Sequence, residues 1–387
     1  MPPTERLAIA GVAPGPPFDP LTWSGSSRSV FNALAARGAL TGAVDGFPRG
    51  LVTLEKAASF SRDAGMWRQR YYAGASPLSP AIRAGMGRIV ARRLRALASE
   101  PDVVLQFGAW CDLSRAPRLR PRLRASYHDG NLAVSLGRED SVLPRDTSGV
   151  RRALRFEQRV YDGVDVIMPM SDWLRDSFIQ DFGQSPTKVV TVGAGPNLTS
   201  MPEPSPRNFE RPRLLFVGRE FERKGGHQLL RAFREVRAKR PDAELWIVSA
   251  HHPAPAPGVR AFGRILRNTP EGEATLQRLY REATTFVLPS LYEPFGIAFL
   301  EAMAYRLPCV GADRCAIPEI VEDGVTGLLA RPEDTDELAA RLLALIADPD
   351  RARDMGEAGF RRLVSRYTWD HVADRMIDAM RSRVPAG

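Results

Sequence analysis

The sequence has little cysteine and histidine, and it has no long hydrophobic run. Its 387 residues include five histidines and three cysteines, Cys111, Cys309 and Cys315. Cysteines so few and so widely spaced exclude a disulfide framework or a zinc knuckle, and they favour a reducing, cytoplasmic setting. The absence of any stretch of about 18 apolar residues excludes a membrane-spanning helix. The opening residues lack the basic segment and apolar run of a secretory signal, so we expect none.

The composition is that of a globular protein. Hydrophobic residues make up 44% of the chain and charged residues 26%, which is enough apolar material for sizeable cores. Disordered and fibrous proteins are therefore excluded. At about 150 residues per domain, the length predicts two or three domains.

Positive charge is concentrated in the first half of the chain. Residues 1–200 carry 26 Lys and Arg against 18 Asp and Glu, a balance of +8, whereas the remainder carries 28 against 27, a balance of +1. Five arginines fall within residues 115–124 and four within residues 86–97. This favours an anionic partner, which is a membrane surface, nucleic acid or a phosphorylated substrate, with a merely arginine-rich composition as the alternative. No aromatic residues interleave with these arginines, which disfavours nucleic acid.

Short β-branched runs alternate with amphipathic stretches, the pattern of parallel sheets with helical crossovers. In the first half the expected strands are 7–13, 102–108, 164–169 and 188–192, and the expected helices are 26–37 and one capped by Ser171.

A segment with five prolines and no periodicity, residues 196–212, marks the expected linker between two domains. In the second half the expected strands are 213–217, 244–248, 259–262, 285–288 and 308–310, and the expected helices are 225–239, 273–283 and 296–305. We therefore predict an α/β fold of two doubly wound, Rossmann-like domains, residues 1–200 and 201–368. Ligands bind at the carboxyl ends of the strands in such sheets, and two facing domains would form a cleft for two substrates.

A basic loop follows the first strand of the second half, in the sequence FVGREFERKGG. Arg219 and Lys224 lie in this loop, and a helix is expected to begin near Gly225. Cations beside a helix N-terminus form an anion site, because backbone N–H groups donate to the same phosphate oxygens that the cations bind. A pair of solvated surface residues is the alternative.

Two acidic residues stand in the sequence SLYEPFGIAFLEAMAYRLPCVG. Glu293 precedes a turn, and Glu301 lies in the helix that follows. A carboxylate accepts two hydrogen bonds from a vicinal diol such as that of a ribose or hexose. Phe295 and Gly296 can offer backbone N–H groups at the start of the helix. Glu301 has apolar neighbours, so its charge needs a partner, which favours a functional role over that of a surface residue.

The loop of residues 19–27 brings Gly25 just before a helix. A glycine there lets a phosphate or sugar approach the backbone closely. The loop matches neither the Gly-x-Gly-x-x-Gly pattern nor a P-loop, which disfavours dinucleotide binding and NTP hydrolysis.

Together the motifs VGR…KGG and EPFG…E, with Glu293 and Glu301 eight residues apart, resemble family 4 of the retaining glycosyltransferases. Residues 316–329, AIPEIVEDGVTGLL, are similar to the stretch after the catalytic helix of that family, and the likeness reaches GAGPNL at residues 193–198. It covers the second half of the chain and, more loosely, the first. The resemblance implies a GT-B fold with the donor nucleotide sugar held mainly by the second domain.

The resemblance also implies roles for the residues of the second domain. Arg219 and Lys224 would bind the diphosphate and stabilise the leaving group. Glu301 would hold the ribose hydroxyls, and Glu293, with the backbone at the start of the following helix, would hold the transferred sugar. The base would be flanked by Gly263, Arg264 and Ile265.

In the first domain the resemblance implies three further features. Gly25 would approach the diphosphate, and His128 would contact the transferred sugar. Asp129 is the alternative polar residue, on the acceptor side. A terminal helix, within residues 369–387, would return to the first domain.

The expected chemistry follows from charge. A glycosyl transition state places negative charge on the departing diphosphate, which two fixed cations can stabilise. No Asp-x-Asp pair lies at an expected strand end, and the pairs that begin at Asp334 and Asp348 are expected to cap helices. We therefore predict transfer without a metal or cofactor, with retention of configuration by front-face attack. A hydrolytic two-carboxylate mechanism suits a phosphate leaving group less well.

Two other functions compete with this one. A non-catalytic sugar-nucleotide-binding or membrane-docking protein is the main alternative, although the intact set of cations and carboxylates disfavours it. An epimerase or phosphorylase of the same fold is the second, but no lysine stands out as a cofactor site. The donor base, the sugar and the acceptor (a glycan, a lipid or a small molecule) stay open, and peripheral contact with an anionic membrane is expected.

Overall fold

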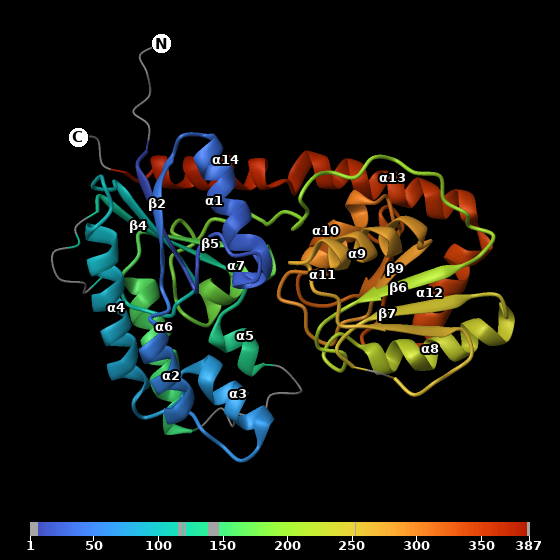
Figure 1. The fold of residues 1–387 in the computed structure, drawn as a ribbon, viewed down its shortest axis with the longest axis horizontal. Helices are drawn as coiled ribbons and strands as arrows, with labels where there is room; N and C mark the ends of the chain where they lie inside the picture. The colour runs from blue at the N-terminus through green and yellow to red at the C-terminus, as the bar shows by residue number, and fades with distance from the viewer. Residues whose placement is uncertain (1–6, 115–118, 120, 138–146, 252, 385–387) are drawn as a thin grey trace, which may run out of the picture. The chain divides into compact units, whose positions relative to one another are not determined.

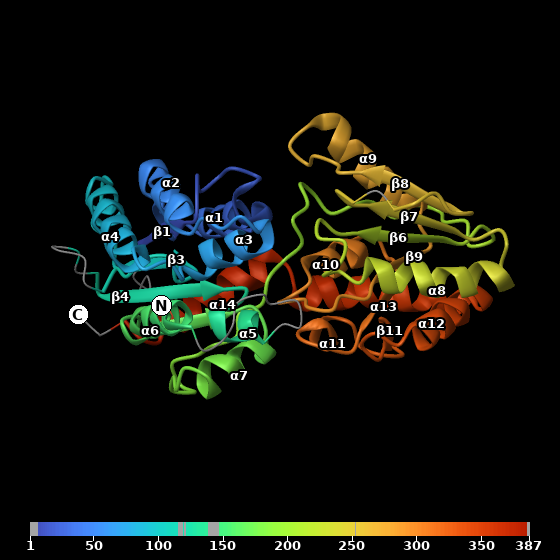
Figure 2. The same ribbon diagram turned by 90° about the horizontal axis from the view of Figure 1, so that it is seen from below.

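The computed structural model describes residues 7–114, 119, 121–137, 147–251 and 253–384. The chain divides into two compact units. Unit 1 comprises Met1–Gly193 and Trp369–Gly387, and unit 2 comprises Ala194–Thr368. In each unit helices flank both faces of a parallel sheet (Figures 1 and 2).

Unit 1 contains a five-stranded sheet. Its strands are β1 (Ile9–Ala13), β2 (Leu40–Asp45), β3 (Val103–Phe107), β4 (Leu123–His128) and β5 (Val166–Pro169). Its helices are η1 (Thr22–Gly25), α1 (Ser26–Ala36), α2 (Arg49–Ala58), α3 (Ala64–Ala73), α4 (Ser79–Arg95), α5 (Leu132–Leu136), α6 (Ser148–Asp162), α7 (Asp172–Gln180) and α14 (Trp369–Arg381). The strand order is β2-β1-β3-β4-β5, with every pairing parallel.

Unit 2 contains a six-stranded sheet. Its strands are β6 (Arg213–Val217), β7 (Glu244–Val248), β8 (Val259–Gly263), β9 (Thr285–Leu288), β10 (Cys309–Ala312) and β11 (Gly327–Ala330). Its helices are α8 (Gly226–Lys239), α9 (Pro270–Glu282), α10 (Ile297–Ala304), α11 (Ile317–Ile320), α12 (Thr335–Ala347) and α13 (Pro349–Arg366). The strand order is β11-β10-β9-β6-β7-β8, again parallel throughout.

One expected strand, residues 188–192, is wrong. The segment runs beside β5 and forms a single isolated bridge, between Ile167 and Val189. Val190 N donates to Ile167 O at 2.9 Å, but the next residue of β5 that faces this segment is Pro169, which has no N–H to continue the ladder. By contrast, the cap predicted at Ser171 is present, with its hydroxyl accepting from Leu174 N at 3.1 Å.

The terminal helix α14 packs against α1 within unit 1. Val372, Met376 and Met380 are buried on its inner face. On its outer side, Arg37 of α1 pairs with Asp370 at 2.8 Å and Asp374 at 2.5 Å. Burial and ion pairs therefore hold α14 against α1.

The proline-rich segment of residues 196–212 is hydrogen-bonded to the rest of unit 2. The Arg207 guanidinium donates to the carbonyls of Tyr305 and Arg306, both at 2.8 Å, and of Tyr280 at 3.4 Å. Three carbonyl contacts from one side chain fix the segment against the unit before β6 begins.

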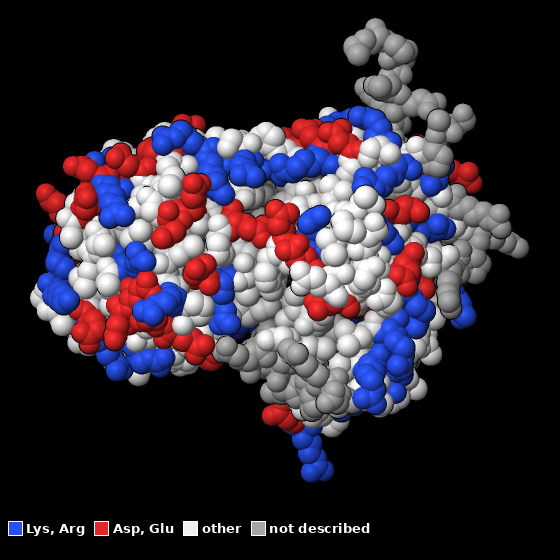
Figure 3. Space-filling model, turned by 180° about the vertical axis from the view of Figure 1, so that it is seen from behind, with Lys and Arg blue, Asp and Glu red and all other residues white. Residues whose placement is uncertain are grey.

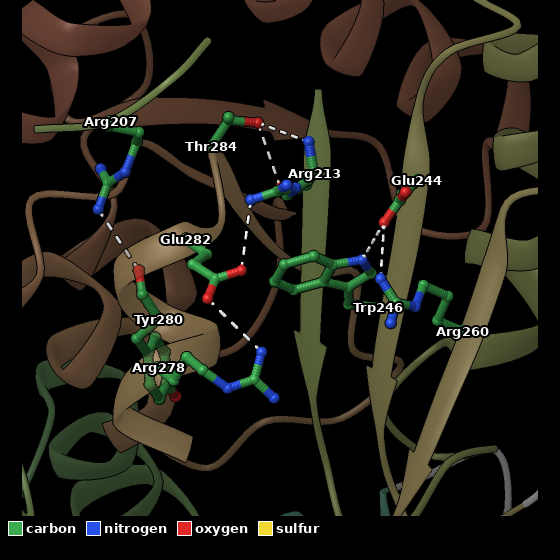
Figure 4. A network of polar contacts seen from close by, with 9 residues as sticks. All are labelled: Arg207, Arg213, Glu244, Trp246, Arg260, Arg278, Tyr280, Glu282 and Thr284. Carbon is green, nitrogen blue, oxygen red and sulfur yellow. Dashed lines mark hydrogen bonds and ion pairs between the residues drawn. The ribbon is translucent and has the colours of Figure 1, made fainter. Parts of the chain in front are cut away.

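A polar network joins the amino ends of the strands in unit 2 (Figure 4). The Arg213 guanidinium lies 5.0 Å from the Trp246 ring centre and 3.4 Å from Glu282. The Trp246 indole N–H donates to Glu244 at 2.6 Å, and Arg213 N donates to Thr284 Oγ1 at 2.9 Å. These contacts lie at the opposite end of the sheet from the carboxyl ends of the strands, so we assign them to stability.

Charge on the surface is mixed. On the face shown in Figure 3, Lys and Arg side chains alternate with Asp and Glu over the described residues. The arginine cluster expected at residues 115–124 lies partly outside the described residues. Of its described members, Arg122 lies 3.6 Å from Asp102 and Arg124 donates to Leu119 O at 3.1 Å. Among the described residues, no helix is both long and apolar enough to cross a membrane.

Candidate functional site

The strand order of unit 2 has a topological switch point between β6 and β9. From β6 the chain proceeds to β7 and β8 on one side and then returns to place β9 on the other. Ligands of doubly wound sheets bind at the carboxyl ends of the strands at such a point. The loops that leave these two strands, residues 218–225 and 289–296, are therefore the first place to look for a site.

The two loops are joined by their backbones. Leu291 N donates to Arg223 O at 2.9 Å, and the Arg223 guanidinium donates to Tyr292 O at 2.7 Å. Gly225 has a φ of +74°, and a Cβ there would stand 1.9 Å from Pro289 O. Only glycine combines this backbone conformation with so close an approach. The sequence thus brings the two loops into contact and starts α8 beside them.

Lys224 and Glu293 pair across these loops. The Lys224 ammonium donates to Glu293 Oε2, which also accepts from the Ser290 hydroxyl at 3.1 Å. Burial alone would raise the pKa of Glu293, but the positive charges of Lys224 and Arg223 outweigh it and hold that pKa below its ordinary value. Burial lowers the pKa of Lys224, and Glu293 opposes the change. The site therefore holds an ionised carboxylate against an ammonium in a largely dry environment.

Glu301 makes a separate pair with Arg267, which follows β8. The guanidinium binds both carboxylate oxygens, with one contact at 2.7 Å, and the Tyr280 hydroxyl donates to Glu301 Oε2 at 3.3 Å. Arg267 also donates to Asn197 O at 3.2 Å. Burial would lower the pKa of Arg267, but the charge of Glu301 overrides it and raises that pKa. Sequence reasoning required a partner for Glu301 but did not find Arg267, which lies in no recognised motif.

The other candidates of unit 2 lie around these pairs. Arg219 is exposed in the loop after β6, and Arg264 is exposed after β8. Phe295 is buried, and Gly296 is the N-cap of α10 with a φ of +108°. The remaining two candidates of this unit, at the carboxyl end of β8, are Gly263, with a φ of +66°, and the half-buried Ile265.

Gly25 lies at the N-terminus of α1 in unit 1. It has a φ of +92°, and the two residues before it, Trp23 and Ser24, are also left-handed, with φ of 49° and 57°. Three successive left-handed residues make a tight turn whose backbone strain is unusual for non-glycine residues. The Trp23 ring is held in place by edge contacts with Phe107 at 5.0 Å and Tyr127 at 5.5 Å.

His128, the predicted sugar contact, is enclosed in the core of unit 1. Its ring is 1% exposed and lies 5.4 Å from the ring of Tyr161 and 5.1 Å from that of Phe178. Neither ring nitrogen has a hydrogen-bond partner among the described residues. Burial lowers the pKa of His128 to about 3, so the ring is neutral at physiological pH. The neighbouring Asp129 is half-buried.

Two further histidines and the two aspartates expected to cap helices lie elsewhere in unit 2. His251 stacks on Phe221 at 4.3 Å, and His252 lies outside the described residues. Asp334 caps α12 by accepting from Glu337 N at 2.8 Å, and Asp348 caps α13 by accepting from Arg351 N at 3.0 Å, so both predicted caps are confirmed. Over the described part of the chain, no group of three or more His, Cys, Asp or Glu side chains could hold a metal ion.

A family model described as "Glycosyl transferases group 1" matches residues 211–348. The match runs from just before β6 to the end of α12. It therefore includes both ion pairs and the switch point.

Two curated relatives illustrate the likeness in sequence. The chain is 32% identical over 254 residues to an alpha-maltose-1-phosphate synthase of Mycolicibacterium smegmatis, covering 58% of this chain and 65% of that protein. It is 29% identical over 324 residues to a GDP-mannose-dependent alpha-(1-6)-phosphatidylinositol monomannoside mannosyltransferase of Mycobacterium tuberculosis, covering 76% and 80%. The chain therefore spans less than two thirds of the length of the Mycolicibacterium smegmatis protein, and it spans 48% of the length of an alpha-maltose-1-phosphate synthase of Mycobacterium tuberculosis, to which it is 36% identical over 188 residues.

Two solved structures share the fold. Sucrose-phosphate synthase from Thermosynechococcus elongatus has a TM-score of 0.70 and 19% identity, covering 97% of this chain and 99% of that one. WaaG, a glycosyltransferase involved in lipopolysaccharide biosynthesis, has a TM-score of 0.61 and 17% identity, covering 98% and 100%.

Two doubly wound parallel sheets that match these structures define a GT-B protein, so the predicted fold class is confirmed. Within that fold class, residues 211–348 and the motifs they contain are similar to the group 1 glycosyltransferases.

Proposed function

We propose that this protein transfers a sugar from a nucleoside diphosphate sugar to an acceptor hydroxyl, with retention of configuration and without a metal or cofactor. One observation carries the proposal. Lys224 and Glu293 meet at the switch point of the unit 2 sheet, beside the N-terminus of α8 and next to the exposed Arg219. A cation pair and a helix N-terminus suit a diphosphate, and a buried carboxylate beside them suits sugar hydroxyls.

The proposed reaction uses these groups at the departing end of the donor. The bond between the anomeric carbon and the diphosphate oxygen breaks, and its electron pair goes to the diphosphate. Arg219 and Lys224 stabilise the charge that develops there. The acceptor oxygen bonds to the anomeric carbon on the same face, and its proton passes to the departing phosphate oxygen.

The donor is held by further contacts in this proposal. Glu293 and the backbone N–H groups of Phe295 and Gly296 hold the transferred sugar, and Glu301 holds the ribose hydroxyls. The base lies against residues 263–265. By their names, one of the two relatives reported above makes alpha-maltose-1-phosphate and the other is a phosphatidylinositol monomannoside mannosyltransferase, which supports an anionic acceptor or an acceptor at a membrane. The basic balance of the first half, +8, favours the same classes.

The first experiment identifies the donor. Thermal unfolding is measured with UDP-, GDP-, ADP- and dTDP-sugars, and a ligand present at 100 times its dissociation constant stabilises the protein by about 2.7 kcal/mol. One base is expected to stand out. If none of these nucleotides shifts the unfolding temperature at millimolar concentration, the donor assignment is wrong.

The second experiment tests the chemistry with the donor so found. Arg219 is exposed, so Arg219→Ala leaves the core intact. We expect it to reduce release of nucleoside diphosphate roughly 10²-fold or more. Lys239→Ala, an exposed change at the far end of α8, is the control and should leave the rate unchanged. Donor binding without turnover on any acceptor in a broad panel would instead support the non-catalytic alternative.

A further inference from the structure

The sheet of unit 1 has a topological switch point of its own, between β1 and β3. From β1 the chain proceeds to β2 on one side and later places β3 on the other. Ligands of doubly wound sheets bind at the carboxyl ends of the strands at such a point. The segments that leave β1 and β3 each carry a tryptophan, Trp23 and Trp110. The segment after β3 has no role in the proposed function.

The loop after β3 holds the Trp110 indole in a fixed place. Gly108 has a φ of +71°, and a Cβ there would stand 2.9 Å from Trp110 Nε1. The indole therefore lies against the glycine, where a larger residue would displace it. The side-chain amide of the buried Gln106 donates to Gly108 O at 2.9 Å and to Cys111 O at 3.4 Å. These two carbonyls lie on either side of Trp110 in the chain, so the fold itself positions the ring.

Side chains from three separate segments meet the Trp110 ring. Phe47, which follows β2, contacts it edge to face at 4.9 Å, and Tyr72, near the end of α3, does so at 6.3 Å. The Arg83 guanidinium of α4 lies 5.8 Å from the ring centre. Phe47 and Trp110 are half-buried and Tyr72 is exposed, so this aromatic group reaches the surface and is not part of the core.

Polar groups accompany these rings, but they add no unbalanced charge. The Trp110 indole N–H and the Tyr72 hydroxyl have no hydrogen-bond partner among the described residues. The Arg83 side chain is buried. Burial lowers the pKa of Arg83, and the charges of Glu55 and Glu157 oppose the change. Since two carboxylates already balance this guanidinium, the group suits a ligand with hydroxyls better than a free phosphate.

We propose that Trp110 stacks on a sugar ring of the acceptor, so that the acceptor is a saccharide or another glycoside. One face of a pyranose presents C–H bonds with a slight positive charge, which the negative face of an aromatic ring attracts. The indole N–H and the Tyr72 hydroxyl would bond the hydroxyls at the edge of the sugar. A lipid chain in this place would leave both polar groups without partners.

This inference rests on the proposed function, which assigns the pairs of unit 2 to the donor and leaves the acceptor open. It names the part of the acceptor that is recognised, and a phosphate or lipid elsewhere on the acceptor is compatible with it. A nucleobase also stacks on tryptophan, so the donor is the competing occupant of the ring. The experiment therefore measures the two ligands separately and without turnover.

The test is calorimetric titration of the full chain with two kinds of probe. The first are the methyl glycosides of glucose, mannose, galactose and N-acetylglucosamine and their disaccharides, and the second is the nucleoside diphosphate that stabilises the wild type. We expect the wild type to bind at least one saccharide and Trp110→Leu to bind it at least tenfold more weakly. Trp110→Phe keeps an aromatic face and should retain most of the affinity. Trp67→Leu removes a partly exposed indole of the same unit and, as the matched control, should bind like the wild type.

Kinetics give a second readout with that saccharide as acceptor. Trp110→Leu should raise the KM for the saccharide about tenfold and leave the KM for the donor unchanged, because the ring contributes binding and not chemistry. The tryptophan fluorescence of the wild type should change when the saccharide is added, and this change should be lost in Trp110→Leu.

Three results would overturn the inference. They are binding of none of the saccharides by the wild type, wild-type saccharide affinity in Trp110→Leu, and a loss of nucleoside diphosphate affinity in Trp110→Leu, which would assign the ring to the donor base. If the saccharide binds through Trp110 but no nucleoside diphosphate is released in its presence, the proposed function fails and the saccharide site stands. Unchanged thermal unfolding shows that Trp110→Leu is folded. If it is not, Tyr72→Ala, an exposed change in the same group, should weaken saccharide binding instead.

Discussion

At the scale of single residues, the site is built on charges that are buried in pairs. Removing one member of such a pair leaves the other without a partner in a poorly solvated place. When Lys224 is lost, Glu293 keeps the Ser290 hydroxyl and the charge of Arg223 but loses its direct ion pair. The residues proposed for binding and catalysis therefore also contribute to stability, and the two effects have to be measured apart.

The Lys224 and Glu293 pair gives a stability prediction. Lys224→Met should lower the free energy of unfolding by about 3–5 kcal/mol, and the double variant Lys224→Met/Glu293→Leu should recover most of the loss. Urea unfolding measures both. As a comparison, Arg353→Met breaks an exposed ion pair with Asp350 and should cost less than about 1 kcal/mol. If the loss of unfolding free energy in the double variant equals the sum of the losses in Lys224→Met and Glu293→Leu, the two side chains do not interact as the structure shows.

His128 gives a prediction about pH. Its pKa is about 3 in the folded protein against an ordinary value of 6.5, so between these values the unfolded chain binds the additional proton. Stability should therefore fall as the pH is lowered from about 6.5 to 3, with a contribution from His128 of about 1.4 kcal/mol per pH unit.

His128→Leu tests that prediction and the predicted catalytic role together. The variant should unfold with a weaker dependence on pH in this window, because no proton is taken up at position 128. Leucine can replace the His128 ring because the ring nitrogens have no hydrogen-bond partners among the described residues, so the substitution breaks no hydrogen bond there. If the folded variant has lost transfer activity at pH 7, the role as a sugar contact is supported. If it keeps activity, that role is excluded.

Arg267 gives a prediction about the donor. It binds both oxygens of Glu301, so Arg267→Gln should misplace the carboxylate proposed to hold the ribose. The dissociation constant of the nucleoside diphosphate should rise about tenfold, the effect of losing one hydrogen bond to a charged group. Calorimetric titration measures it, with Arg278→Gln, an exposed change on α9, as the control. An unchanged dissociation constant would show that Glu301 does not hold the ribose.

Most of these residues could be predicted from the sequence as site residues, but the ion pairs that they form could not. Opposite charges after neighbouring parallel strands were available as a signal for Lys224 and Glu293, yet both were assigned to a ligand and not to each other. Arg267 could not be found, because it lies 34 residues from Glu301 and only the folded sheet brings them together. The burial of His128 could not be predicted either, because its neighbours Tyr161 and Phe178 come from helices far along the chain.

At the scale of elements, the strands that were predicted correctly are continuous apolar segments long enough to form a central strand. Residues 213–217, 244–248 and 285–288 form strands over the predicted ranges, because central parallel strands are buried on both faces. The strands of residues 40–45 and 123–128 were not predicted. The first, LTGAVD, is an edge strand that is half-exposed, and the second, LRASYH, includes polar residues.

The terminal helix gives a prediction at this scale. Met376 of α14 is completely buried in unit 1, so Met376→Ala should lower the free energy of unfolding by about 2–5 kcal/mol. Arg381→Ala, an exposed change on the same helix, should have a much smaller effect. Equal, small effects in urea unfolding would mean that α14 does not pack on unit 1 in solution.

At the scale of the whole molecule, two parallel sheets could be predicted from the alternation of strands and helices alone. The strand orders could not, because they depend on where the chain reverses direction. In unit 2 that reversal falls between β6 and β9, and it determines which loops meet. The uneven charge of the two halves is also a property of the whole chain.

The most direct test of the proposed function is the release of nucleoside diphosphate by Glu293→Gln. Glutamine keeps the shape of the side chain and an acceptor for Ser290 but removes the charge paired with Lys224. We predict that the folded variant releases nucleoside diphosphate at least about 10²-fold more slowly than the wild type, whereas Glu235→Gln, an exposed change on α8, matches the wild type. Release at the wild-type rate by Glu293→Gln would contradict the account.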